Sequence, residues 1–117
     1  MKYLEKSKQM YNQVLQGQLM EAFEKNYAEH VVMEEPAGKR EGKAACRAYE
    51  EQFLSNLETF HGMEIKAMSE DTEKAKVFVE VEMDVTFKGG NRVKMEQVAV
   101  QQWENDQIVH ERFYYNA

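Results

Sequence analysis

The chain has 117 residues, of which 43% are hydrophobic, including one Trp, six Tyr and six Phe. This length suits one domain spanning residues 1–117, and so much apolar surface excludes a disordered segment. The formal net charge of −6 argues against nucleic acid and anionic membranes as partners, because both are bound mainly through clustered Lys and Arg.

The start of the chain and its single cysteine together predict a reducing compartment inside the cell. The polar start, Met1 to Lys6, lacks the apolar stretch of a secretion signal, and no long apolar segment follows. The single cysteine, Cys46, cannot form an internal disulfide, and no Cys/His spacing suggests zinc. We therefore expect a cytoplasmic protein that uses no metal and no cofactor.

The first half of the chain is predicted to be mainly helical. Apolar residues three and four positions apart predict a helix from Tyr3 to Gly17 and a shorter one from Leu19 to Tyr27. The β-branched run Val31–Glu35 ends at the only proline and predicts an edge strand or a strand end. The next residues, Pro36–Gly42, have the composition of a turn. A long amphipathic helix should follow, with one stripe formed by Cys46, Tyr49, Phe53, Leu57 and Phe60.

The second half of the chain changes to a period of two. Alternation from Val77 to Phe87 gives the clearest strand of the sequence. Gly89-Gly90 and Asn105-Asp106 are turn signals, so further strands are expected over Arg92–Trp103 and Ile108–Tyr115. Helices followed by such an antiparallel meander make an α+β domain, in which the helices cover one face of the sheet.

Turns of two residues would fix the strand pairing and define the face that looks toward the helices. Met83 would then lie opposite Glu96, and Val81 opposite Val98. On the last strand the same face would carry Glu111, Phe113 and Tyr115.

The opposite face of the predicted sheet is too apolar for solvent and too polar for a core. We therefore expect it to form the interface of a homodimer. Its predicted residues are Phe78, Glu80, Glu82, Met95, Gln97, Ala99, Gln101, Trp103, Ile108, His110, Arg112 and Tyr114.

Three segments carry a resemblance to a known family: Tyr27–Pro36, Gly42–Ala45, and Gln101–Trp103 with Ile108–Tyr115. With them the chain resembles the SnoaL-like polyketide cyclases and the steroid isomerases of the nuclear transport factor 2-like superfamily, over nearly its whole length. The resemblance implies a cystatin-like cone, with three helices packed on a curved antiparallel sheet around an internal pocket. The same fold hosts isomerases, cyclases, hydrolases and binding proteins, so it leaves the function open.

The resemblance also implies a candidate base. In the steroid isomerases the acidic residue before this proline moves a proton beside a ketone, and Glu35 occupies that position. The two donors of their oxyanion hole match Met10 and Val98, which cannot donate hydrogen bonds, and Tyr11 replaces the first only after a one-residue slip. The final-strand acid/base aspartate of the polyketide cyclases matches Phe113.

The predicted site is therefore an apolar pocket with few polar groups, suited to a small apolar molecule. Proton transfer is assigned to Glu35, and Glu96 and Tyr115 are expected to orient the substrate. The residues expected to line the pocket are Tyr11, Met33, Tyr49, Phe53, Met83, Val98, Glu111 and Phe113.

Two functions fit this pocket. The first is cofactor-free proton transfer on a small apolar carbonyl compound, by an isomerase, cyclase or lyase. The second is a non-catalytic, dimeric module that binds a hydrophobic small molecule. Convergence of Glu35, Glu96 and Tyr115 would favour the enzyme, whereas Glu35 turned to solvent would favour the binding module.

Overall fold

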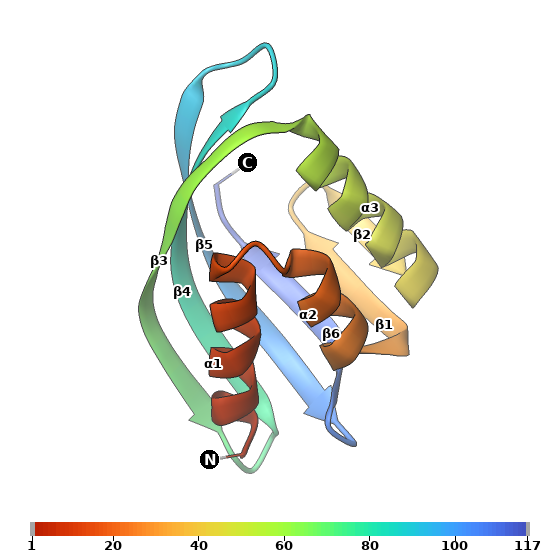
Figure 1. Ribbon diagram of the computed structural model, residues 1–117. Helices are drawn as coiled ribbons and strands as arrows, with labels where there is room; N and C mark the ends of the chain where they lie inside the picture. The colour runs from red at the N-terminus through yellow and green to blue at the C-terminus, as the bar shows by residue number, and fades with distance from the viewer. Residues whose placement is uncertain (1, 117) are drawn as a thin grey trace.

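The computed structural model describes residues 2–116 and places three helices against one curved sheet (Figure 1). All three helices lie on the same side of the sheet, and the strands curve around them. The elements in chain order are α1 (Lys2–Leu15), α2 (Leu19–Asn26), β1 (Tyr27–Glu35), β2 (Gly38–Glu41), α3 (Lys43–Asn56), β3 (Leu57–Asp71), β4 (Lys76–Phe87), β5 (Arg92–Glu104) and β6 (Gln107–Tyr114).

The sheet has the strand order β2-β1-β6-β5-β4-β3 over the described residues. Neighbouring strands are antiparallel except β1 and β6, which run parallel. The predicted α+β architecture, three helices on a curved and mainly antiparallel sheet, is confirmed. None of these helices is both long enough and apolar enough to cross a membrane, as far as residues 2–116 are concerned.

Two element boundaries differ from the prediction. The third helix ends at Asn56 rather than at Phe60, because Leu57 begins β3, whose residues pair along the whole length of β4. Strand pairing thus overrides the helical spacing of Leu57 and Phe60. The segment predicted as a turn contains β2, which forms a hairpin with β1 and pairs Met33 with Arg40.

The predicted register of β5 is wrong by one residue. Residues 88–91 connect β4 to β5, and Thr86 pairs with Arg92, whereas the predicted two-residue turn would have paired it with Val93. A slip of one residue turns every side chain of a strand to the other face. Glu96 and Val98 therefore point away from the helices, and the predicted inward position of both is wrong. The residues of the predicted interface face that point toward the helices instead are Met95, Gln97, Ala99, Gln101, Trp103 and, on β6, Ile108.

A bulge on β6 returns the last strand to its predicted orientation. Trp103 pairs with Ile108, but Gln102 pairs with His110, so Val109 is the extra residue. As a result Glu111 lies beside Gln101 and faces the helices. A homodimer through the outer sheet face stays a prediction, now for the face that carries Glu80, Val98, Arg112 and Tyr114.

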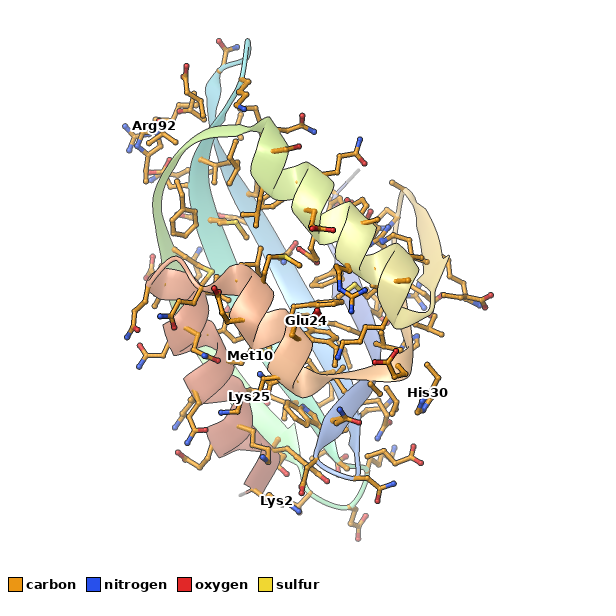
Figure 2. The ribbon with its side chains drawn as sticks, turned by 45° about the vertical axis from the view of Figure 1, so that its right-hand side comes forward. Lys2, Met10, Glu24, Lys25, His30 and Arg92 are labelled. Carbon is orange, nitrogen blue, oxygen red and sulfur yellow. The ribbon has the colours of Figure 1, made fainter. Side chains whose placement is uncertain are left out.

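The core lies between the sheet and the two N-terminal helices. Its largest side chains include Trp103 and Phe23, and the ring of Tyr3 stacks on Trp103 with 5.0 Å between ring centroids. Burial of a large apolar side chain contributes about 1.5–3 kcal/mol, so this cluster fixes α1 and α2 on the sheet. An ion pair also connects α2 to α3: Glu24 of α2, labelled in Figure 2, accepts two hydrogen bonds of 2.9 and 2.8 Å from Arg47 of α3.

Gly42, immediately before α3, is expected to be intolerant of a side chain. Its φ of +92° and ψ of 149° lie in a region that other residues avoid, while an added Cβ would meet no atom within 4 Å. We therefore expect Gly42→Ala to lower the free energy of unfolding in urea by roughly 1–3 kcal/mol, through backbone strain alone. Gly38→Ala is the matched control, because Gly38 has open space and no positive φ. Equal stability of the two variants would contradict the prediction.

Candidate functional site

A cavity of about 290 Å³ lies between the helices and the concave face of the sheet. All three helices and five strands, β1, β3, β4, β5 and β6, contribute to its wall. Met10 of α1, labelled in Figure 2, is buried and lines it. Its other apolar lining residues include Val14, Phe23, Phe53, Leu57, Phe60, Met63, Met83, Met95 and Phe113.

The polar part of the wall carries carboxyl and hydroxyl groups. No Lys, Arg or His side chain lines the cavity among the described residues. Such a wall presents three carboxyl groups to the cavity and no cation. The polar lining residues are Glu35, Glu50, Glu111, Tyr11, Tyr27, Tyr49, Tyr115 and Gln97.

Glu35 ends β1, and its carboxylate is held by three side chains. Its Oε1 accepts hydrogen bonds from Arg40 (3.0 Å) and Tyr49 (2.8 Å), and its Oε2 accepts one from Tyr115 (2.9 Å). The side chain is only 8% exposed, so Glu35 is not turned to solvent. Burial and the bond to Glu35 raise the pKa of Tyr49 to about 12, so this hydroxyl stays protonated as a donor.

Arg40 was missed from the sequence because its segment was predicted as a turn. Its guanidinium carbon lies 3.5 Å from the centroid of the Tyr49 ring, in addition to the ion pair with Glu35. The hairpin that brings it there pairs Met33 with Arg40. Pro36 followed by Gly38 is the turn signal that could have predicted this hairpin.

Glu111 of β6 is a carboxyl group buried against the cavity, with an exposed fraction of 1%. Its Oε1 accepts a hydrogen bond from Tyr27, and its Oε2 accepts one of 3.2 Å from Gln101. Burial raises its pKa from the ordinary value of 4.5 to about 7, against the lowering effect of these two hydrogen bonds. A group with this pKa both takes and gives protons at neutral pH.

Gln101 connects Glu111 to the core. Its side-chain oxygen accepts hydrogen bonds from Ser7 of α1 and from the indole of Trp103 (3.1 Å), while its nitrogen donates to Glu111. Gln101 and Ser7 are both fully buried. The sequence did not predict these linked hydrogen bonds, because the predicted register of β5 put Gln101 on the outer face.

Glu50 of α3 is a second carboxyl group with a raised pKa. Burial, followed by the nearby charge of Glu35, raises its pKa to about 7, although Arg40 acts in the opposite direction. Glu50 forms no hydrogen bond or ion pair with any other group in residues 2–116. It follows Cys46 by four positions, so its place on the inner stripe of the helix was available from the sequence but was overlooked.

The structure brings together most of the predicted pocket residues but not all of them. Met33 is 1% exposed and belongs to the core, outside the cavity wall. Glu96 is 70% exposed, lies within 3.5 Å of Lys66 and lines a groove on the outer face, as does Val98. The predicted residues that line the cavity are Tyr11, Glu35, Tyr49, Phe53, Met83, Glu111, Phe113 and Tyr115.

The family assignment comes from comparison with known proteins. The profile of the SnoaL-like domain matches residues 4–115. The chain belongs to the SnoaL-like domain family. No curated protein matches its sequence.

Solved structures of this SnoaL-like protein's relatives have the same fold. A proposed SnoaL-like polyketide cyclase from Mesorhizobium loti is 28% identical, with 98% of this chain and 100% of that chain covered and a TM-score of 0.84. A proposed isomerase from Bacillus subtilis is 19% identical, with coverage of 96% and 84% and a TM-score of 0.81. An epoxide hydrolase from M. tuberculosis is 17% identical, with coverage of 97% and 77% and a TM-score of 0.77. The same fold thus occurs in proteins that are named for different activities.

Within residues 2–116 no group of three His, Cys, Asp or Glu side chains lies close enough together to hold a metal ion. The three carboxyl groups on the cavity wall can act as acids, bases and hydrogen-bond acceptors.

Proposed function

We propose that this SnoaL-like protein catalyses cofactor-free proton transfer on a small apolar carbonyl compound, as an isomerase, cyclase or lyase. The observation that carries the proposal is Glu111, a buried carboxyl group on the wall of an apolar cavity, with a pKa raised to about 7. A general base is most effective when its pKa is near the working pH. The polyketide cyclases that the chain resembles also carry their acid/base aspartate on the final strand, but at the position of Phe113, two residues after Glu111 on the same cavity-facing side.

The proposed reaction uses groups of this chain alone. Glu111 takes a proton from the carbon beside the carbonyl, and the electrons of that C–H bond move to the carbonyl oxygen. Tyr27 and Gln101 keep the carboxyl group in one orientation. Tyr11 also lines the cavity, and burial together with the charge of Glu111 raises the pKa of its hydroxyl well above 10.0, so it stays protonated and donates to the oxyanion.

Glu35 receives a different role from the one expected from the sequence. A base needs a free lone pair that points at the substrate, and the Glu35 carboxylate already accepts three hydrogen bonds, one of them from a cation. We therefore assign Glu35 to positioning Tyr49 and Tyr115 at the cavity wall. This arrangement also favours the second function, binding without turnover, because the residue that acts as base in the steroid isomerases is engaged here.

Exchange of deuterium into a simple ketone tests the proposed reaction without knowledge of the natural substrate. Wild-type protein is expected to accelerate exchange of the protons beside the carbonyl of cyclohexanone in D2O, measured by proton NMR near neutral pH. Glu111→Gln keeps the shape of the side chain but removes the base, so the protein-dependent rate should fall by about 100-fold or more. Far-ultraviolet circular dichroism and thermal unfolding check that the variant is folded.

The control for this experiment is Glu96→Gln on the outer face, which should exchange at the wild-type rate. Wild-type exchange that survives Glu111→Gln unchanged would refute the role of Glu111. Binding of cyclohexanone without any accelerated exchange would instead support the non-catalytic binding module.

A further inference from the structure

The charges around the cavity are unbalanced. Its wall carries the carboxyl groups of Glu35, Glu50 and Glu111, and no cationic side chain from residues 2–116 lines it. Arg40 lies behind Glu35 and compensates that carboxylate through a 3.0 Å ion pair. Glu111 accepts its hydrogen bonds from Tyr27 and Gln101, and both of these donors are neutral. The cavity thus has an excess of acceptors.

Among the three carboxyl groups of the cavity, Glu50 is the one without a partner in residues 2–116. It lines the cavity from α3, and in residues 2–116 no side chain or backbone group donates a hydrogen bond to it. Glu50 is partly buried, and a carboxylate that loses part of its hydration without gaining a donor is destabilised, so a ligand that supplies a donor at this point removes that cost. The titratable groups that interact with its charge are Tyr11 on α1, Tyr27 and Glu35 on β1, Arg40 on β2, Cys46 on α3 and Glu111 on β6.

We infer that the cavity selects small apolar molecules that carry a protonated amine, whose ammonium group binds the carboxylate of Glu50. This inference rests on the proposed function and names its substrate class, a small apolar carbonyl compound with a basic amine. An ammonium group supplies the missing donor and the missing positive charge together. Aromatic rings of the wall, among them Tyr11 and Phe53, add faces that attract a cation.

Other small ligands of the same shape satisfy the cavity less well. A hydroxyl group donates a neutral hydrogen bond to Glu50 but brings no charge. A carboxylate brings a second negative charge close to Glu50 and Glu111, and like charges in a buried site repel strongly. The expected order of affinity is therefore amine, then alcohol, then carboxylate.

Three ligands with one ring and different head groups test this order. Cyclohexylmethylamine, cyclohexylmethanol and cyclohexanecarboxylate are titrated into the protein by calorimetry at neutral pH. The amine is expected to bind about tenfold or more tightly than the alcohol, because a hydrogen bond to a charged group is stronger than a neutral one. Glu50→Gln should reduce the affinity for the amine to that for the alcohol. Glu51→Gln, one position along the same helix and exposed, is the matched control and should behave as wild type.

Proton release gives a second readout that a loss of folding cannot imitate. The pKa of Glu50 is raised to about 7, so the carboxyl group of the free protein is partly protonated at neutral pH. A bound ammonium group lowers that pKa, so binding of the amine should release protons, measured as a difference in heat between buffers of different ionisation enthalpy. Glu50→Gln should reduce this release, and the alcohol should cause little of it.

The outcomes separate this inference from the proposed function. Equal affinity for amine and alcohol in wild type, or an amine preference that survives Glu50→Gln, overturns the inference even if cyclohexanone exchange is catalysed. A Glu50-dependent amine preference supports it even if no exchange is catalysed, in which case only the catalytic proposal fails.

Discussion

Replacing Glu111 by Gln is expected to remove a large part of the pH dependence of stability. The pKa of Glu111 is raised from 4.5 to about 7 in the folded chain, chiefly by burial. Between these values the folded state holds a proton that the unfolded state has released. The contribution of Glu111 to the free energy of unfolding is therefore fully present below about pH 4.5. It decreases as the pH rises toward about 7 and changes no further above that pH.

The size of the effect follows from the shift. The rise in the pKa of Glu111 from 4.5 to about 7 corresponds to roughly 3 kcal/mol of stability. Between about pH 4 and pH 8, the free energy of unfolding of wild type should therefore fall by roughly 3 kcal/mol more than that of Glu111→Gln. Urea unfolding across this range measures both curves. Glu50 contributes in the same direction but is present in both proteins, so its effect largely cancels in the comparison.

Glu96→Gln is the control, because its carboxyl group is exposed, and its curve should run parallel to wild type. The carboxyl groups whose pKa is lowered by ion pairs, such as Asp84 with Arg92, lose their stabilising effect at lower pH and are common to all three proteins. Parallel curves for wild type and Glu111→Gln would contradict the raised pKa of Glu111.

Replacing Gln101 by Leu is expected to be strongly destabilising although Leu is apolar and of similar size. The change leaves the indole N–H of Trp103, the hydroxyl of Ser7 and one oxygen of Glu111 without their partner in the core. A buried polar group left unsatisfied costs about 1–3 kcal/mol, so after the gain from burying Leu we expect a loss of roughly 3 kcal/mol in the free energy of unfolding.

Gln97→Leu is the matched control for this change. Gln97 lies on the same strand and the same face and lines the cavity, but it forms no side-chain hydrogen bond within the described residues. Its replacement should leave stability nearly unchanged. Because the bond from Gln101 lowers the pKa of Glu111, Gln101→Leu should also move the pH-dependent loss of stability to higher pH. Equal stability of the two variants would refute the buried hydrogen-bond chain.

The sequence predicted the presence of the helices and strands better than the residues at which they begin and end. Alternation of Val77, Val79 and Val81 fixed β4, because a strand that is buried on one face needs an apolar residue at every second position. The end of α3 was placed too late, because Leu57 and Phe60 continue the helical spacing while pairing with β4 decides their structure. Local spacing cannot detect a partner strand that comes twenty or more residues later.

The candidate site was predicted in part for a related reason. Glu35, Tyr115 and Glu111 were found by their position before the proline and on the last strand. The inward position predicted for Glu96 was wrong, because the composition of a glycine-containing loop does not show which residues pair beside it. A register shift of one residue turns every side chain of the strand to the other face. Arg40 was missed because it reaches Glu35 only through a short hairpin.

The sequence by itself determined the class of fold, because this depends on the order and periodicity of apolar residues along the chain. It also indicated the family, through the resemblance of three segments, and the SnoaL-like profile over residues 4–115 agrees. Only the tertiary structure decided which carboxyl groups face the cavity, which of them has a partner, and how far burial raises the pKa of Glu111 and Glu50. These properties depend on the register between strands and on desolvation by distant segments. Neither is encoded in the spacing of neighbouring residues.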